Sequence, residues 1–408
     1  MNLIKLSWKY LISKPLNTGL NILLLAMGLA IITVLLLMQD QFENKMTRDA
    51  KGIDLVIGAK GSPLQLVLSS VYHIDFPTGN IPLNEAEGVS KNRLIKNVIP
   101  MGMGDNYNGY RIIGTNHDYL ELYEASFKEG KAWEFPFETV VGHAVARKLE
   151  LELGSKFVGS HGIGTASHAH EEHDYVVVGV LEKQDNVLDQ LILTSIESVW
   201  YTHDEDHDHE KFEQPVATTG FPNSEQPDRE VTSLLVQYRN PIAAVQLPRF
   251  INSRSSLQAA SPSFEISRLF ELLGIGIKLV QGLAVVIIVI AGLGIFIALY
   301  NSLKERKYDL AVMRTLGASR GTLFVHIILE GFLLTMLGGI LGLAIGHFFL
   351  WLLVITNEQG ALAGLRPDVF LAEELWLLLI ALATGVLASL IPAWNAYRTD
   401  IAKQLTGA

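Results

Sequence analysis

The sequence predicts a membrane protein with four transmembrane α-helices and a large extracytoplasmic α+β domain inserted between the first and the second helix. Three observations support this fold class. Hydrophobic residues make up 49% of the chain and gather in four runs, each close to the roughly 20 residues that a helix needs to cross a bilayer. Positive charges divide unequally between the two sides of those runs. The long segment between the first two runs alternates strand-like and helix-like stretches.

The apolar runs set the expected boundaries. The first, at residues 16–39, is too long for the apolar part of a signal peptide, so we expect an uncleaved anchor. Before it, Lys5, Lys9 and Lys14 alternate with apolar residues, which favours a short interfacial helix that Pro15 ends; an ordinary basic flank is the alternative. The expected order is 1–15 cytoplasmic interfacial helix, 16–39 first span, 40–270 extracytoplasmic (periplasmic) domain, 271–300 stalk and second span, 301–322 cytoplasmic coupling helix, 323–355 third span, 356–374 extracytoplasmic loop, 375–395 fourth span, and 396–408 cytoplasmic tail.

The orientation follows from the basic residues, which concentrate on cytoplasmic flanks. They lie near the N-terminus, between the second and third spans, and in the tail, whereas the loop at 356–374 has one arginine and four acidic residues. We therefore expect a multi-pass protein of the inner (plasma) membrane with both termini in the cytoplasm.

The charge of the exported segment limits its partners. Between Arg48 and Arg268 there are 19 basic and 31 acidic residues, which argues against nucleic-acid binding there. The chain has no cysteine, which excludes disulfides, thiolate metal sites and thiol nucleophiles.

The exported segment reads as a mixed α+β domain. The runs YRIIGT, DYVVVGVLE and TSLLVQY are strand-like, and HAVARKLELEL and LDQLILTSIESVWY are helix-like. From Pro262 onward a helical period continues into the second span, which predicts one stiff helix from the domain into the membrane.

The loop between the second and third spans is expected to contain a short helix. Leu310, Met313 and Leu316 recur at helical spacing, and Gly317 with Ser319 supplies a stop and a restart. We expect this helix to present an apolar and a charged face to a cytoplasmic partner.

Four stretches together resemble one known family. KERKYDLAVMRTLGASRGTL resembles the coupling segment of the MacB/FtsX-like permeases of ABC transporters. TVVGHAVARKLELELGSKF with DYVVVGVLEKQDNVLDQLILTS resembles their extracytoplasmic domain, and HIILEGFLLTMLGGILGLAIG and SLIPAWNAYRTDIAKQL resemble their third and fourth spans. The resemblance covers most of the chain, in order.

The resemblance implies a non-catalytic permease subunit that works with a separate ABC ATPase in two copies and with a second permease copy, identical or related. It implies ATPase-coupling contacts at Glu305, Arg306, Leu310, Arg314, Gly317 and Ala318. No G-x-x-x-x-G-K-[ST] motif occurs, so ATP and Mg²⁺ are expected in the partner and no cofactor in this chain. Membrane lipid and a periplasmic carrier or metal-binding protein are the other expected partners.

The leading functional hypothesis is transmission of ATPase-driven movement to the extracytoplasmic domain, for export or extraction of a substrate or for action on a periplasmic partner. A signalling scaffold that activates a cell-wall hydrolase without transport is the first alternative, and the length of the exported domain argues against it. A membrane-anchored metallohydrolase is the second.

Two features of the third span stand out. His326 and Glu330 lie four residues apart and therefore on one helical face. They could form a proton relay, but we favour a pair that bonds a neighbouring helix. Gly338, Gly339, Gly342 and Gly346 give a small-residue spacing that lets another helix approach closely, within the subunit or across a dimer.

Two histidine-rich segments depart from the family pattern. HGIGTASHAHEEHDY and THDEDHDHE contain seven of the twelve histidines beside many carboxylates, a ligand set suited to Zn²⁺, Cu²⁺ or Ni²⁺. The candidate metal ligands are His161, His168, His170, His173, His203, His207 and His209. The alternative is a solvated acidic loop. HEEH lacks the H-E-x-x-H spacing, which argues against a zinc protease.

Overall fold

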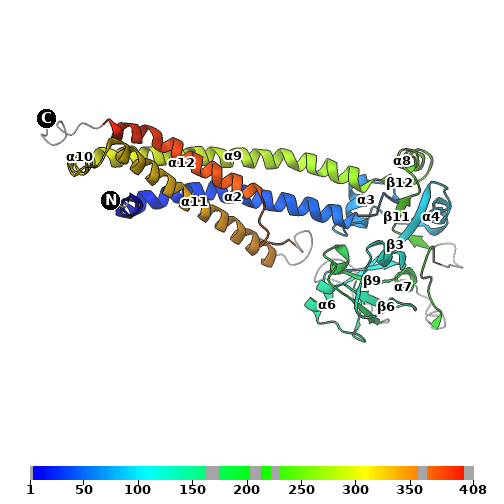
Figure 1. Cartoon of the computed structure of the whole chain (residues 1–408). Coiled ribbons are helices and arrows are strands. Elements are labelled where there is room, and N and C mark those ends of the chain that lie inside the picture. The colour runs from blue at the N-terminus through cyan, green and yellow to red at the C-terminus, as the bar shows by residue number, and fades with distance from the viewer. Residues whose placement is uncertain (1–2, 161–173, 203–212, 223–228, 357–364, 399–408) are drawn as a thin grey trace. The chain divides into compact units, whose positions relative to one another are not determined.

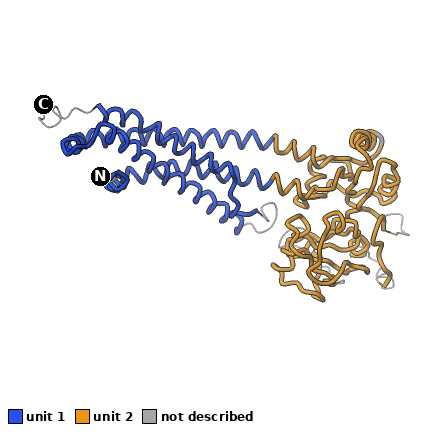
Figure 2. The backbone as a smooth tube through the Cα atoms, in the orientation of Figure 1, with its two compact units in different colours: residues 1–42, 272–358, 362–408 blue, residues 43–271, 359–361 orange. Residues whose placement is uncertain are grey.

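The computed structural model describes residues 3–160, 174–202, 213–222, 229–356 and 365–398. The chain divides into two compact units, and each is described by itself (Figure 2). Unit 1 comprises residues 1–42, 272–358 and 362–408, and unit 2 comprises residues 43–271 and 359–361.

All the regular elements in the described part of unit 1 are helices (Figure 1). Its elements are α1 (Leu3–Ser13), most of α2 (Pro15–Asp49), most of α9 (Pro262–Glu305), α10 (Lys307–Thr315), α11 (Arg320–Thr356) and α12 (Glu373–Tyr397). In the described ranges, four helices are long and apolar enough to cross a membrane: α2, α9, α11 and α12. The predicted number of spans is therefore confirmed, although α2 continues well past the expected end of the first span at residue 39.

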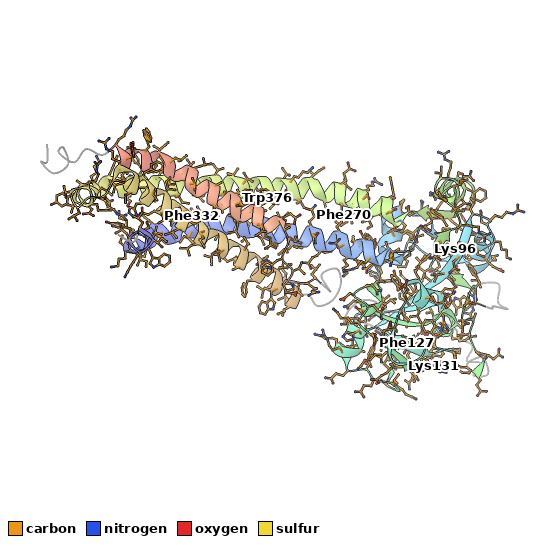
Figure 3. The ribbon with its side chains drawn as sticks, in the orientation of Figure 1. Lys96, Phe127, Lys131, Phe270, Phe332 and Trp376 are labelled. Atoms are coloured by element: carbon orange, nitrogen blue, oxygen red, sulfur yellow. The ribbon has the colours of Figure 1, made fainter. Side chains whose placement is uncertain are left out.

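The spanning helices pack through small and aliphatic residues. Leu25 and Leu29 of α2 share a buried cluster with Ala284 and Ile288 of α9 and with Ala381 of α12. Large apolar side chains are also exposed on these helices, among them Leu279 and Leu283 of α9. Trp376 of α12, labelled in Figure 3, is another. An apolar exterior of this kind is what a lipid environment requires.

Unit 2 is built on a mixed sheet with short helices around it. In its described part the strand order is β12-β1-β11-β3-β4-β9-β6-β8-β5, and β7 also pairs with β8. These strands are β1 (Leu55–Ala59), β3 (Ile95–Tyr107), β4 (Tyr110–Thr115), β5 (Phe127–Gly130), β6 (Glu138–Val141), β7 (Lys156–Phe157), β8 (Tyr175–Leu181), β9 (Leu191–Ser195), β11 (Ser233–Tyr238) and β12 (Leu257–Ala260). A separate pair joins β2 (Ile81–Pro82) to β10 (Glu230–Val231).

The helices of unit 2 are mostly short. They are α3 (Pro63–Ser70), α4 (Leu83–Ser90), α5 (Asp118–Leu122), α6 (His143–Leu149), the 3₁₀ turn η1 (Val187–Gln190), α7 (Ile196–Thr202) and α8 (Ala243–Arg254). With strands and helices interleaved along the chain, this is the mixed α+β domain that the sequence predicted after the first span.

The long strand β3 belongs to both halves of the sheet. Its segment Ile95–Met101 pairs with β11, and its segment Gly102–Tyr107 pairs with β4, with a register irregularity between Met103 and Asn106. The β4–β9 and β6–β8 pairs are parallel, whereas the other pairs are antiparallel.

Both α2 and α9 have an end in the apolar core of unit 2. Met46 of α2 and Ile266 of α9 belong to the buried cluster that contains Val56 and Ile99 of the sheet. The Tyr72 hydroxyl donates a hydrogen bond of 3.1 Å to the Met46 carbonyl. The helix that begins at Pro262 is continuous to Glu305, as the sequence predicted.

One predicted helix is partly wrong. LDQLILTSIESVWY was expected to be helical, but Leu191–Ser195 forms the buried strand β9 and only Ile196–Thr202 forms a helix. The reason is tertiary: β9 pairs along both edges with β4 and β6, and all five of its residues are buried, so both of its faces are covered as well. A short apolar run of this kind fits either a buried strand or a buried helix.

Candidate coupling site

The candidate site is the segment that joins α9 to α11 in unit 1, and its helix ends as the sequence predicted. After α10, Gly317 has a φ of +99°, in the left-handed region that favours glycine. The Ala318 N–H donates to the Met313 carbonyl at 3.0 Å, and the Gly317 N–H donates to the Arg314 carbonyl at 3.1 Å. This pair of bonds is a Schellman motif, which satisfies carbonyls at the end of α10.

The chain restarts as a helix two residues later. The Ser319 Oγ accepts a hydrogen bond of 3.1 Å from the Thr322 N–H, which caps the first turn of α11. The predicted stop at Gly317 and restart at Ser319 are therefore both confirmed, and they fix α10 as a short, separate helix.

The apolar face of α10 packs inward. Leu310 is only 3% exposed, in a cluster with Leu303, Leu323 and Ala393, and Met313 packs against the same cluster. The expectation that Leu310 lies on an outward face is therefore wrong, because α11 and α12 cover that side. By contrast, Leu316 is 82% exposed at the end of the helix.

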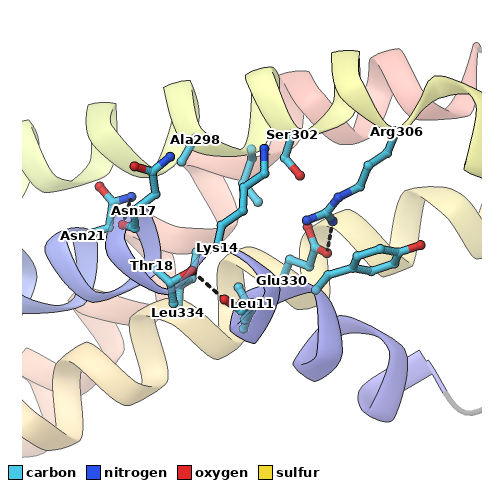
Figure 4. Close-up of a pocket in the computed structure, with 12 residues that line it drawn as sticks. Leu11, Lys14, Asn17, Thr18, Asn21, Ala298, Ser302, Arg306, Glu330 and Leu334 are labelled. Carbon is cyan, nitrogen blue, oxygen red and sulfur yellow. Dashed lines mark hydrogen bonds and ion pairs between the residues drawn. The ribbon is translucent and has the colours of Figure 1, made fainter.

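Arg306 also points into the bundle. Its Nη1 lies 3.0 Å from Oε1 of the buried Glu330 side chain, and its guanidinium carbon lies 3.9 Å from the centre of the Tyr10 ring (Figure 4). Burial and the nearby Asp309 carboxylate raise the pKa of Tyr10. Arg306 therefore fixes the junction of α9 and α10 rather than facing a partner.

His326 completes this buried polar network. Its Nδ1 is joined to the Ser7 Oγ of α1 by a hydrogen bond of 2.8 Å, and its Nε2 lies 3.6 Å from the Glu330 carboxylate. Both members of the pair thus bond other elements, Ser7 on α1 and Arg306 at the start of α10. The contacts favour the structural interpretation of His326 and Glu330 over a proton relay.

The remaining coupling residues are closer to the surface. Glu305 is exposed and forms an ion pair with Lys14, the residue between α1 and α2. Arg314 is half-buried, and Gly317 and Ala318 form the turn. The site therefore divides the six predicted coupling residues into an inward pair, Arg306 and Leu310, and four that lie at or near the surface.

Sequence reasoning missed the part of the site that α1 supplies. Ser7 and Tyr10 lie some 300 residues before the side chains that they contact, and no local pattern links them. The regular spacing of Lys5, Lys9 and Lys14 indicated a helix but did not indicate which of its faces is buried.

A small cavity with both polar and apolar lining residues lies beside the network (Figure 4). It measures about 40 Å³, and its lining includes Lys14, Asn17, Asn21 and Ser302. The Ser302 Oγ is buried and has no hydrogen-bond partner among the described residues. A cavity of this size has room for a few water molecules beside its polar lining residues and is far smaller than a typical small-molecule site.

The glycine series of α11 faces other helices of the same chain. A Cβ built on Gly338, Gly342 or Gly346 would come within 3.0 Å of an atom of α2, and one built on Gly339 would lie 3.0 Å from Leu378 of α12. These glycines therefore serve helix packing within the subunit, which was one of the two alternatives for this spacing.

All seven candidate metal ligands, His161, His168, His170, His173, His203, His207 and His209, lie outside the described residues. Within the described ranges, no group of three or more His, Asp or Glu side chains could hold a metal. Two described residues at the ends of the histidine-rich segments do meet: the hydroxyl of Tyr175, the last residue of the first segment, and the hydroxyl of Thr202, the first residue of the second, are 3.0 Å apart.

Comparisons with known proteins match the two parts of the chain. The family model for the MacB-like periplasmic core domain matches residues 18–247, and the model for the FtsX-like permease C-terminal matches residues 282–401. The "Uncharacterized ABC transporter permease YknZ" of Bacillus subtilis (strain 168) is 28% identical over 69 residues. That alignment covers 17% of this chain and 17% of the relative.

Two solved structures are similar to part of the chain. The periplasmic region of MacB from Actinobacillus actinomycetemcomitans is 13% identical, with a TM-score of 0.36, and the match covers 56% of this chain and 98% of that one. The extracellular domain of the noncanonic ABC-type transporter YknZ from Gram-positive bacteria is 12% identical, with a TM-score of 0.31, and the match covers 51% and 99%.

The family follows from the two family models and from the order in which they occur. The periplasmic core domain model alone spans more than half of the chain, and the permease model covers α11, α12 and the part of α9 from residue 282 onward. The chain belongs to the MacB/FtsX-like family of ABC transporter permeases.

Proposed function

We propose that this permease receives movement from its ATPase at α10 and conveys it along α9 to the periplasmic unit, where it acts on a substrate or a protein partner. Membership of the family implies a separate ATPase partner, an inner-membrane location and a subunit type that is typically non-catalytic. We propose an assembly of two permeases and two ATPases, with both termini in the cytoplasm.

The continuity of α9 is the observation that carries this proposal. The helix runs without a break from Pro262 to Glu305, a length of about 66 Å at the usual rise of 1.5 Å per residue. Its first turns supply Ile266 to the core of unit 2, and its last turn supplies Leu303 to the cluster that holds α10. A single stiff helix with packed ends conveys displacement better than a jointed one.

The site divides the coupling residues by role. We assign ATPase contact to Glu305, Arg314, Gly317 and Ala318, together with the exposed side chains of Tyr308 and Leu316. Arg306 and Leu310 act as positioning residues, because their side chains hold α10 against the bundle.

An insertion in α9 tests the transmission of movement. Seven glycine and serine residues inserted after Glu271 would form a flexible joint, whereas seven alanine-rich residues would extend the helix by about two turns and keep it stiff. A label at Ile242→Cys should report a nucleotide-dependent change in unit 2 of the reconstituted complex. We expect the change to survive the alanine-rich insertion and to vanish with the flexible one. Equal responses of the two variants would contradict transmission along α9.

A charge on the exposed face tests the contact with the ATPase. Leu316→Asp removes little packing because the side chain is 82% exposed, yet it places a charge beside Gly317. We expect Leu316→Asp to abolish stimulated ATPase activity and co-purification of the ATPase. Ile242→Asp, an equally polar change on an exposed residue of unit 2, is the control. An intact complex with Leu316→Asp would refute the assignment.

We further propose that the two histidine-rich segments bind a divalent metal, with zinc as the first candidate, for sensing or for delivery to a periplasmic carrier. The proposal is supported by the density of imidazole and carboxylate groups. It is also supported by the Tyr175–Thr202 hydrogen bond, because Tyr175 ends the first segment and Thr202 begins the second.

Calorimetric titration of the full chain with Zn²⁺ tests the metal proposal. We expect binding that weakens when His168, His170 and His173 are replaced by alanine. The control replaces two histidines outside the segments, His117 and His143. An absence of binding at micromolar Zn²⁺ would remove the proposal.

A further inference from the structure

The described part of the connection between α11 and α12, residues 365–372, is attached to α2, and it is called the strap below. The side chain of Gln41 in α2 pairs with the backbone of Arg366 in the strap. Its Nε2 donates to the Arg366 carbonyl at 2.9 Å, and its Oε1 accepts from the Arg366 N–H at 2.6 Å. Leu365 is buried in one cluster with Leu37 of α2. Two hydrogen bonds and an apolar contact therefore hold the strap against α2.

The strap is also attached to α11 and α12, through the side chain of His347 in α11. The His347 Nδ1 lies 2.7 Å from the Pro367 carbonyl oxygen, and its Nε2 lies 2.9 Å from Oε2 of Glu374, in the first turn of α12. The Glu374 side chain is buried, and its other oxygen accepts the Leu371 N–H at 3.0 Å. The centres of the His347 and Phe370 rings are 4.4 Å apart, so an aromatic ring lies beside the imidazole. One imidazole thus joins α11, the strap and α12.

The hydrogen bonds of this imidazole determine how many protons it shares. The Pro367 carbonyl oxygen can only accept, so the His347 Nδ1 carries the hydrogen of that bond. A neutral imidazole would then turn the lone pair of Nε2 toward the Glu374 carboxylate, and two acceptors 2.9 Å apart repel each other. The contact is a hydrogen bond only when a further proton lies on Nε2 or on Oε2. His347 and Glu374 together therefore hold one proton more than a neutral imidazole and an ionised carboxylate.

We propose that His347 and Glu374 form a binding site for one proton, and that this proton attaches the strap to α11 and α12. Loss of the proton as the pH rises places two acceptors face to face, so the strap separates from the His347 side chain. The attachment is therefore present at low pH and lost at high pH. The pair between Gln41 and the strap contains no titratable group and stays in place. Because the site uses none of the coupling residues, the inference is independent of the proposed transmission along α9.

The other charged groups around the proton site do not take part in its hydrogen bonds. In the strap, Arg366 and Asp368 pair with each other at 2.9 Å and are exposed. In α12, the neighbouring carboxylate of Glu373 is exposed. The first charged residue along α2 is Asp40, and α11 has no charged residue other than histidine after Glu330. The pH response of the strap is therefore assigned to the one histidine and the one buried carboxylate.

A spin label on the strap measures the proposed separation. The full chain has no cysteine, so Asp368→Cys accepts a single label in the permease alone, in nanodiscs of phosphatidylcholine. Asp368 is exposed, and its surface pair with Arg366 contributes little stability. We expect a mostly restricted label at about pH 5 and a mostly mobile label at about pH 10, a range that spans the ordinary titration of histidine. Equal mobility of the label at both pH values would overturn the proposal.

The variant Glu374→Gln separates the proton from the geometry, with the same label at Asp368→Cys. A glutamine amide N–H donates to the Nε2 of a neutral imidazole, and its oxygen still accepts the Leu371 N–H, so the strap stays attached without the extra proton. We expect a restricted label at both pH values in Glu374→Gln and a mobile label at both in Glu374→Leu. Glu373→Gln, the same change at the neighbouring exposed residue, should keep the original pH response. A Glu374→Gln variant that still releases the label at high pH would also overturn the proposal.

Discussion

A single methyl group added to α11 should separate it from α2. A Cβ at Gly342 would lie 2.8 Å from the Leu29 Cβ, 2.9 Å from the Ala26 carbonyl oxygen and 3.2 Å from the Ala26 Cα. Contacts under about 3.4 Å with backbone atoms cannot be relieved by a side-chain rotation, so the two helices must move apart. Overpacking of this kind costs about 1–3 kcal/mol.

Gly282 of α9 is the matched control, because a Cβ there meets nothing within 4 Å. Both Gly→Ala changes lie within a helix, so each gains the same helix propensity, about 0.5–1 kcal/mol. The difference between the two variants therefore isolates the steric cost. We expect Gly342→Ala to be about 1–3 kcal/mol less stable than Gly282→Ala.

The free energy of unfolding is measured by titrating the purified chain from mild detergent micelles with dodecyl sulfate, with tryptophan fluorescence as the signal. Equal free energies for Gly342→Ala and Gly282→Ala would show that α2 and α11 are not in close contact. That result would refute the account of the glycine series.

Three further changes test other parts of the chain. Arg306→Leu leaves the Glu330 carboxylate buried without its partner and should lower the free energy of unfolding by about 3–5 kcal/mol in the same titration. The double variant with Glu330→Leu should regain most of that stability. A loss below about 1 kcal/mol in the single variant would contradict the buried pair. In Gly317→Ala the added Cβ meets no atoms within 4 Å, so the change should lower the free energy of unfolding only by the strain of an alanine in the left-handed conformation, about 1–2 kcal/mol. It should also lower ATPase stimulation. Wild-type values in both assays would argue against the turn. In unit 2, burial and, to a smaller extent, the Arg111 cation lower the pKa of His73 to about 3. Unfolding of unit 2, followed by urea at several pH values, should therefore become easier by about 1.4 kcal/mol per pH unit as the pH falls from 6.5 towards 3, and the His73→Gln variant should lack this slope; parallel curves for the two proteins would refute it.

The sequence predicted the features that depend on nearby residues. Four spans follow from the length of the apolar runs, because the bilayer thickness sets a minimum. The stop at Gly317 follows from the one residue type that adopts a φ of +99° without strain. The strands β4, β8 and β11 follow from β-branched runs bounded by turn residues.

The features that the sequence did not predict depend on residues far apart in the chain. Leu310 faces inward because Ala393 and Ala396, at the end of α12, cover it. Arg306 faces inward because Tyr10 and Glu330 receive it. The residues that Leu310 and Arg306 contact lie outside the coupling segment. The spacing of apolar and charged residues within that segment therefore could not distinguish a face that contacts the ATPase from a face that packs against the other helices of the chain.

The double role of β3 has a mechanical consequence for unit 2. The strand β12 ends at Ala260, two residues before α9 begins. Among the described strands, β12 is connected to the half of the sheet that contains β4 through β1, β11 and then β3. A force applied to β12 by α9 would therefore pass through the hydrogen bonds of one half of the sheet before it reaches the other half. The strand β3 belongs to both halves and connects them. The pairing of β3 with β4 is interrupted between Met103 and Asn106. Under such a force, the two halves of the sheet would begin to rotate against each other at this interruption.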